Sequence, residues 1–238
     1  WVARAGVTGA APERAARARR AGAERSEAGG GCMRQRGGSW RRAAREGESG
    51  GGIAARQIRA QYDDRVIRVY QAYSDAIADS ALERQTFVAP PFKMERMTWI
   101  KPSFLWMMYR AGWGEKEEGQ KRILAIDIRR DGFEWALAHG CDSRAEPGME
   151  AVAWEQLKAR SPVRIQRDLE RDLLLRPLPY RAIQIGLGRE AVRAYVDEWI
   201  QGITDVTAQA HAIHALVKAG RMEEAQSALP RERAYPRG

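Results

Sequence analysis

The sequence is poor in the residues that build the most recognisable scaffolds and sites. Its 238 residues include only two cysteines, Cys32 and Cys141, and three histidines. Two cysteines cannot form the disulfide framework of a small secreted protein, and they favour a reducing compartment. The longest apolar run, Phe104–Tyr109, is far shorter than the ~20 residues that a membrane span requires. The composition therefore excludes disulfide-rich and transmembrane classes and predicts a cytoplasmic protein.

The sequence also lacks the common catalytic motifs. It holds no GxxxxGK[ST] phosphate loop, no HExxH and no paired CxxC. Gly186-Leu-Gly188 before a helical pattern matches half of a dinucleotide fingerprint, but it comes late and lacks the third glycine. His211 and His214 share a helix face, whereas catalytic zinc usually takes three protein ligands. We therefore predict no metal site.

Residues 1–52 differ in composition from the rest of the chain. They contain 12 of the 23 glycines and 11 of the 40 basic residues, all arginine, against 5 of the 31 acidic residues. Few large apolar side chains accompany them, so burial cannot offset the entropy of ordering this segment. The composition predicts a disordered tail over residues 1–52, followed by a folded domain over residues 53–238.

Three interpretations of this tail stay open. Arginine clusters such as Arg17–Arg20 attract phosphate without reading sequence, which suits a nucleic-acid-binding arm. An arginine-rich transit peptide is a second interpretation, although the five glutamates count against it. The third is a non-native stretch translated from GC-rich DNA upstream of the true start, because the chain opens on Trp1. Since the tail carries most of the net charge of +9, that charge alone does not establish a nucleic-acid partner.

The remaining residues alternate between strand and helix patterns. Val66–Tyr73 is rich in β-branched and aromatic residues, which predicts a strand, and the apolar residues of 122–128 predict a central strand. Strands are also predicted at 97–100, 163–166, 173–175 and 181–186, with a charged turn at 167–172, and helices at 75–85, 102–110, 131–140, 152–158, 190–201, 204–218 and 222–229. This irregular order predicts an α+β fold, with a single mixed or antiparallel sheet and a helical C-terminus.

The strongest local signal for a ligand is the segment Trp99-Ile-Lys-Pro-Ser103. Lys101 and Ser103 stand at the start of an apolar helix, whose free backbone N–H groups favour an anion. Trp106 and Arg110 lie four residues apart on that helix, so they are predicted to form a cation–π pair. The plainer alternative is that Ser103 only caps the helix and Lys101 faces water.

The predicted strands add further candidates. Arg68 and Tyr70 share one strand face, while Gln71 and Tyr73 belong to the other. An arginine fork for phosphate and an aromatic plate for a base are what a nucleotide pocket needs. Arg181 and Gln184 offer a second set, although exposed arginine and tyrosine residues on strands are also ordinary cross-strand pairs.

Five segments together resemble the domain-of-unknown-function family 4291: residues 67–73, 85–88, 97–110, 177–186 and 203–207. The run from Trp99 to Arg110 is long enough to be specific, and the resemblance extends over about residues 56–238. It implies the family's fold but no reaction. It also implies that the polar and aromatic residues of the shared segments line a pocket, namely Arg68, Tyr70, Gln71, Tyr73, Trp99, Lys101, Ser103, Arg110, Arg181 and Gln184.

Two functions follow from these residues. The first is an enzyme that binds a nucleotide or another phosphorylated ligand, with NAD-dependent ADP-ribosyl transfer as its specific form, Arg68 and Lys101 meeting around the ligand and Glu198 orienting the acceptor. The alternative is a non-catalytic nucleic-acid-binding module that uses the arginine-rich tail with exposed Tyr and Trp side chains. A structural role in a complex is a third. No membrane partner is expected.

Overall fold

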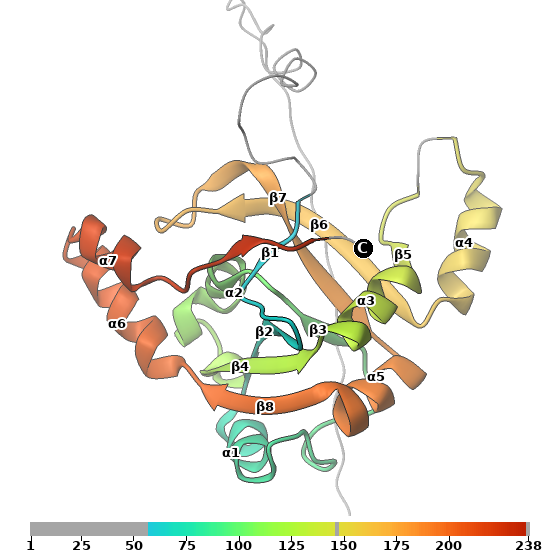
Figure 1. The fold of residues 1–238 in the computed structure, drawn as a ribbon, viewed down its shortest axis with the longest axis horizontal. Coiled ribbons are helices and arrows are strands. Elements are labelled where there is room, and N and C mark those ends of the chain that lie inside the picture. The colour runs from blue at the N-terminus through green and yellow to red at the C-terminus, as the bar shows by residue number, and fades with distance from the viewer. Residues whose placement is uncertain (1–56, 146–147, 237–238) are drawn as a thin grey trace, which may run out of the picture. The chain divides into compact units, whose positions relative to one another are not determined.

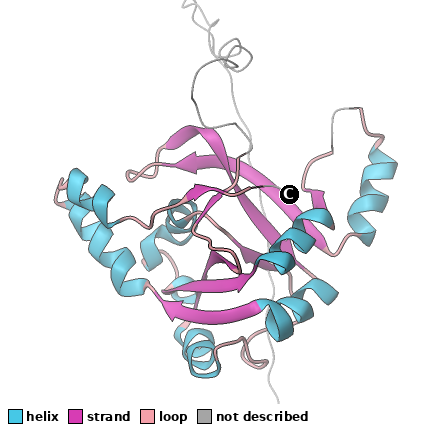
Figure 2. Ribbon diagram, in the orientation of Figure 1, coloured by secondary structure: helices cyan, strands magenta, loops and turns pink. Residues whose placement is uncertain are grey.

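The computed structural model describes residues 57–145 and 148–236. The predicted tail, and with it the boundary between residues 52 and 53, lies outside these ranges. Helices and strands alternate along the described chain, so the fold is α+β (Figures 1 and 2). No helix in the described ranges is long and apolar enough to cross a membrane.

The strands of the described part form three sheets rather than one. β2 (Val66–Tyr73), β4 (Arg122–Arg129) and β8 (Ile200–Asp205) form an antiparallel sheet with β4 in the centre. β3 (Thr98–Ile100), β7 (Pro177–Leu187), β6 (Val163–Arg171) and β5 (Gly140–Asp142) form the second sheet, in which only the β5–β6 pair is parallel. β1 (Arg59–Ala60) pairs with β9 (Arg233–Ala234), which joins the start of the described chain to its end.

A hydrophobic core lies between the two larger sheets. Ile67 and Val69 of β2 and Ile126 of β4 pack in one cluster with Ile165 of β6 and Ile185 of β7. Helices α1 (Asp75–Arg84), α3 (Arg130–Ala138) and α5 (Glu190–Ala194) contribute further apolar side chains to it. Because strand residues alternate in direction, the residues between these core positions on β6 and β7 face away from the core.

A second core covers the other face of the β2–β4–β8 sheet. Tyr70 and Ala125 pack there against α2 (Phe104–Ala111), α6 (Thr207–Lys218) and α7 (Met222–Ala228). The latter two helices lie side by side at one edge of the molecule in Figure 1. The predicted helical C-terminus is therefore present, and it buries the apolar face that β4 presents on that side.

The buried helix α2 begins at Phe104, two residues later than the sequence predicts. Ser103 is the N-cap, and its hydroxyl accepts a hydrogen bond from the backbone N–H of Trp106 at 3.1 Å. Pro102 therefore precedes the cap instead of occupying the first turn. Gly112, with a φ of 55°, ends the helix in the left-handed conformation that glycine adopts at low cost. α4 (Ala151–Arg160), by contrast, buries none of its residues.

The sequence prediction was wrong for the hairpin between residues 163 and 187. Residues 167–172 were predicted as a charged turn, yet β6 continues through them to Arg171. The turn is at residues 172–176, where the Asp172 carboxylate accepts hydrogen bonds from the backbone N–H groups of Leu174 and Arg176. Leu173 and Leu175 of this turn pack against the second core.

A second error concerns the end of the predicted helix 190–201. α5 and a π-helical turn at Tyr195–Trp199 reach only Trp199, and β8 begins at Ile200. Ile203 of β8 is buried against the first core and pairs with Ile126 of β4. The helical spacing of the apolar residues before it masked the start of this strand.

Candidate functional site

A cavity of about 1030 Å³ lies over the outward face of the β3–β7–β6 sheet. The segment 91–97, helix α2 and the ends of β2 and β6 contribute to its walls. Among the described residues that line it, one side chain is acidic, Asp168, and seven are basic: Lys93, Arg96, Lys101, Arg110, Arg144, Arg171 and Arg181. Such an excess of one charge attracts and concentrates anions.

The Trp99 indole forms part of the cavity wall because β7 carries a glycine beside it. Trp99 and Gly186 are directly opposed in the β3–β7 pairing. A Cβ atom on Gly186 would lie 3.0 Å from the Trp99 ring and 2.6 Å from the Met97 sulfur. The glycine therefore allows the indole to lie against the strand, where an aromatic face is open to the cavity.

A buried hydrogen-bond network supports the wall around Trp99. The Gln71 amide nitrogen donates to the Thr98 hydroxyl at 2.6 Å and to the Tyr73 hydroxyl at 2.9 Å. The Gln71 carbonyl accepts from the Tyr195 hydroxyl at 2.7 Å. Since the amide is satisfied at both ends, it fixes the position of its neighbours. Burial raises the pKa of Tyr73 and of Tyr195, so both phenols stay protonated.

Lys101 is the most unusual group in the cavity. Its side chain is 7% exposed, and its ammonium donates to the backbone carbonyl of Trp99 at 2.9 Å. Across the described ranges no carboxylate forms an ion pair with it. Burial, and to a lesser degree the positive charge of Arg110, lowers the pKa of Lys101 to about 7. A buried cation without a counter-charge is costly in the free protein, and a bound anion would relieve that cost.

A second set of donors lies where α2 meets the end of β6. The Arg171 guanidinium stacks on Tyr109, 3.7 Å from the ring centroid, and lies 5.6 Å from the ring of Trp106. The Trp106 Nε1 and the Arg171 Nε are buried and have no hydrogen-bond partner in the part of the chain described. The predicted cation–π partner of Trp106 was Arg110, and the structure has Arg171 there instead.

Asp168 lies across the sheet from Lys101 and is held by neutral groups. Its Oδ2 accepts hydrogen bonds from the amides of Gln166 at 2.9 Å and Gln184 at 3.3 Å. Gln166 and Gln184 are directly opposed in the β6–β7 pairing, so the two amides point to one carboxylate oxygen. Arg181, two positions away from Ile183 on β7, donates to the Arg167 carbonyl at 3.2 Å.

The structure brings seven of the ten predicted site residues to this cavity: Gln71, Tyr73, Trp99, Lys101, Arg110, Arg181 and Gln184. The other three predicted residues, Arg68, Tyr70 and Ser103, do not line it. Each of these three already has a partner within the protein.

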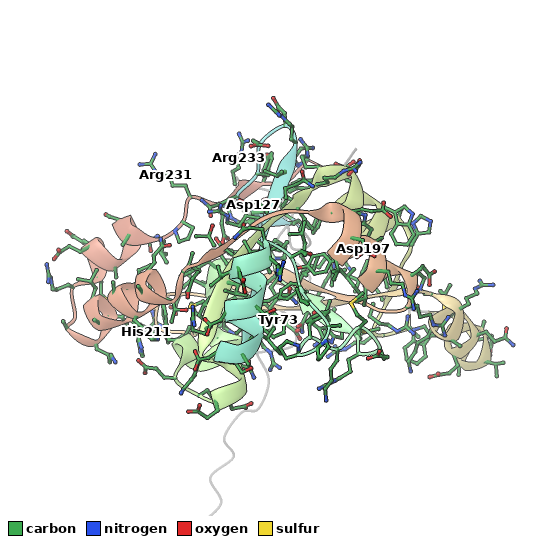
Figure 3. The ribbon with its side chains drawn as sticks, turned by 90° about the horizontal axis from the view of Figure 1, so that it is seen from below. Tyr73, Asp127, Asp197, His211, Arg231 and Arg233 are labelled. Atoms are coloured by element: carbon green, nitrogen blue, oxygen red, sulfur yellow. The ribbon has the colours of Figure 1, made fainter. Side chains whose placement is uncertain are left out.

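The expected meeting of Arg68 and Lys101 around one ligand is wrong. Arg68 is paired with Asp127 in the β2–β4 register, and its guanidinium donates to both carboxylate oxygens, at 2.8 Å and 2.7 Å. Hydrogen bonding to Asp127 raises the pKa of Arg68. Asp127 and the cavity residue Tyr73 lie in separate parts of the molecule in Figure 3. A bidentate pair with a matched carboxylate satisfies the guanidinium without a ligand.

The predicted anion site at the start of α2 exists, but the chain itself fills it. The backbone N–H of Phe104 donates to the Glu232 carboxylate at 2.7 Å, although 128 positions separate the two residues. Ser103 uses its hydroxyl to cap the helix. Tyr70 is 1% exposed, and its hydroxyl donates to Gln61 at 2.9 Å. Neither Ser103 nor Tyr70 is therefore available to a ligand.

His214, one of the two histidines of α6, has structural contacts. His214 stacks on Trp113 with ring centroids 4.9 Å apart, and its Nδ1 lies 3.4 Å from the Glu115 carboxylate. No group of three or more metal-ligating side chains occurs within residues 57–145 and 148–236. Glu198, expected to orient an acceptor, does not line the cavity.

Sequence reasoning missed several cavity residues, chiefly Arg96, Gln166, Asp168 and Arg171. Three of these belong to β6, whose far half was read as a turn. Had residues 163–171 been recognised as one strand, the alternation of Arg164, Gln166 and Asp168 with Val163 and Ile165 would have placed the polar residues on a shared outward face.

Comparison with known families and proteins identifies the family of this chain and assigns it no reaction. No curated protein matches the chain. The family described as "Domain of unknown function (DUF4291)" matches residues 57–235, which include every described residue that lines the cavity. The resemblance seen in the sequence segments is therefore confirmed, and the chain belongs to the DUF4291 family.

Proposed function

We propose that this protein is an enzyme that binds a nucleotide or another phosphorylated small molecule in the cavity on β3, β6 and β7. The observation that carries the proposal is the excess of basic over acidic side chains in the described cavity lining, around a buried Lys101 that lacks a counter-charge. Phosphate oxygens are the acceptors that lysine ammonium and arginine guanidinium groups bind best.

The size and lining of the cavity also favour a nucleotide over free phosphate. A volume of about 1030 Å³ is at the upper end of the range for small-molecule sites. Trp99, Trp106 and Tyr109 all contribute to the lining, and aromatic rings stack on nucleobases. Inorganic phosphate would use the cations and leave this aromatic surface unoccupied.

The specific reaction we propose to test is ADP-ribosyl transfer from NAD. In that reaction the bond between the ribose C1′ and the nicotinamide nitrogen breaks, an acceptor forms a bond to C1′ and loses a proton, and nicotinamide leaves as a neutral molecule. The aromatic surface and cations suit the base and pyrophosphate of such a donor. Asp168 is the described carboxylate that lines the cavity, so it replaces Glu198 as the candidate acidic group.

Thermal unfolding of the full chain tests the binding proposal. NAD, ADP-ribose, ATP and inorganic phosphate are added separately at millimolar concentration. A ligand at a hundred times its dissociation constant stabilises the folded state by about 2.7 kcal/mol. We expect at least one nucleotide to raise the melting temperature by several degrees, and phosphate to raise it less.

Two variants localise the effect. Lys101→Met removes the buried cation, whereas Arg193→Ala removes an exposed arginine of α5 that does not line the cavity. The nucleotide shift should disappear in the first and persist in the second. Release of nicotinamide from NAD by the full chain then tests the transfer reaction. Binding of RNA or DNA that survives Lys101→Met, without a nucleotide shift, would favour the nucleic-acid-binding alternative.

A further inference from the structure

A carboxylate such as that of Asp168 is unexpected in a cavity that binds anions. It lines the same space as seven basic residues, yet in the described part of the chain no ion pair joins it to any of them. Its contacts are instead to two neutral amides, those of Gln166 and Gln184. Asp168 and the cations of the cavity therefore do not neutralise one another through ion pairs.

The two oxygens of this carboxylate are used unequally. Both amides donate to Oδ2. Within the described ranges Oδ1 accepts no hydrogen bond, and it is accessible to solvent. The amides thus fix the carboxylate and leave Oδ1 able to accept a hydrogen bond from a ligand. An ionised carboxylate only accepts hydrogen bonds, so the ligand atom beside Oδ1 must carry a hydrogen.

A phosphorylated ligand would have to satisfy both regions at once. Phosphate oxygens next to Asp168 would meet an uncompensated negative charge, so the phosphates belong with Lys101, Arg110 and Arg171. The part of the ligand near Asp168 must then be a neutral hydrogen-bond donor. In a nucleotide the sugar hydroxyls are the donors that adjoin the phosphates, and a ribose presents two of them on neighbouring carbons.

We propose that Asp168 accepts a hydrogen bond from a ribose hydroxyl, so that the cavity selects ribonucleotides over 2′,3′-dideoxyribonucleotides. This inference rests on the proposed function, because it places a nucleotide in the cavity. Gln166 and Gln184 are positioning residues, since both donate to Oδ2 of the carboxylate and neither binds Oδ1. A hydrogen bond to a charged group in a desolvated site corresponds to a difference in affinity of about ten- to a hundredfold.

Calorimetric titration of the full chain tests the inference. ADP and GDP are compared with their 2′,3′-dideoxy analogues, which lack both hydroxyls and keep the base and the phosphates. We expect the ribonucleotide to bind at least tenfold more tightly than its dideoxy analogue. In Asp168→Asn, whose amide keeps the shape of the carboxylate but loses its charge, this ratio should fall below about threefold.

Asp197→Asn is the matched control. Asp197 is an exposed residue of the π-helical turn, does not line the cavity and lies well away from Tyr73 in Figure 3. This variant should keep the wild-type ratio. If Asp168 only braced the β6–β7 hairpin, Asp168→Asn would lower the melting temperature and leave the ratio unchanged.

The outcomes separate the two claims. Equal affinities of the wild-type chain for the ribonucleotide and its dideoxy analogue would overturn the inference and leave nucleotide binding standing. That comparison needs no variant, so it holds even if Asp168→Asn fails to fold. If neither ADP nor GDP binds at millimolar concentration, and none of the nucleotides in the thermal screen does, the proposed function and this inference fail together.

Discussion

Basic side chains occur in two regions of this protein, and the two regions treat them differently. On the β2–β4–β8 sheet each arginine meets aspartate: Arg68 pairs with Asp127, and Arg122 contacts Asp75, Asp79 and Asp205. In the cavity on β3, β6 and β7, Lys101 and Arg110 have no carboxylate partner within the described ranges. The first region is neutralised by the fold itself. In the second region Lys101 and Arg110 are not neutralised by a carboxylate of the described chain.

Paired and unpaired cations should respond to mutation in opposite ways. Removing one member of a matched pair leaves the other charge uncompensated, which destabilises the folded state. Removing a buried cation that has no partner relieves a desolvation cost instead. Stability and ligand affinity therefore separate the two regions, and the predictions below exploit that contrast.

The largest expected effect is the loss of ligand affinity in Lys101→Met. Nucleotide affinity should fall about a hundredfold, because a desolvated charge–phosphate contact is lost, while the melting temperature of the free protein should rise. In Arg68→Met the melting temperature should fall and the affinity should stay within about threefold of wild type. Titration calorimetry and thermal unfolding measure the two quantities. The contrast between the regions would collapse if both variants changed the same quantity in the same direction.

Next in size is the effect of the paired region on stability. Arg122→Ala leaves three aspartates near one another without their common partner, and it should reduce the free energy of unfolding by about 2 kcal/mol. Urea unfolding at neutral pH measures this loss. Arg193→Ala, which removes an exposed arginine of α5, should change it by less than about 0.5 kcal/mol. A loss of similar size in both variants would show that the cluster around Arg122 contributes nothing specific.

A pH-dependent effect concerns the carboxylate that fills the start of α2. Burial, together with the nearby charge of Glu170, raises the pKa of Glu232 from 4.5 to about 8. Between these values the folded state holds a proton that the unfolded state has released, so stability falls as the pH rises from 4.5 to 8. Glu232→Gln keeps an oxygen acceptor for the Phe104 N–H and cannot titrate. Its free energy of unfolding should therefore fall less than that of wild type between pH 5 and pH 8, by about 3 kcal/mol.

Glu223→Gln is the control for this pH dependence. Glu223 is an exposed residue of α7, so its neutral variant should keep the wild-type slope. Urea unfolding of the three proteins at pH 5, 6, 7 and 8 measures the slopes. Parallel curves for wild type and Glu232→Gln would mean that Glu232 is ionised in the folded state throughout this range.

The smallest effect is expected at the aromatic wall. In Gly186→Ala the new Cβ would come within 3.0 Å of the Trp99 ring, so the indole must shift by a few tenths of an ångström. Nucleotide affinity should fall about threefold, since stacking contacts tolerate small displacements. Gly202→Ala, whose new Cβ would make only an ordinary contact with Gln85 at 3.8 Å outside the cavity lining, should leave the affinity at the wild-type value. Titration calorimetry resolves the difference, and an unchanged affinity in Gly186→Ala would remove Trp99 from the ligand contacts.

Local patterns predicted much of the fold. Val66–Tyr73 formed the strand that its β-branched and aromatic residues indicated, and 122–128 formed the expected central strand because its residues are apolar on both faces. The far half of β6 could not be found in this way. In this half Leu169 is exposed and Glu170 is buried, so it lacks the apolar alternation that marks a half-buried strand.

The sequence predicted those site residues that are close together in the chain. It did not predict contacts between residues that are far apart in the chain. Trp99 and Lys101 stand in one short segment, and both line the cavity. The pairing of Arg68 with Asp127 depends on strand register over 59 positions, and the filling of the α2 start by Glu232 depends on the path of the C-terminal segment. Neither is encoded in the spacing around the residue concerned.

The pKa of the Lys101 ammonium tests the central claim most directly. It is measured by NMR in chain labelled with ¹³C at lysine Cε, with the signal assigned from its absence in Lys101→Met. The account predicts a pKa of about 7 in the free protein, and a rise of at least two units when the cavity is saturated with a nucleotide, because a phosphate beside the amine stabilises its charged form. A pKa near 10.5 in the free protein, or one that stays the same at saturating nucleotide, would contradict the claim that this cavity holds its charge for an anionic ligand.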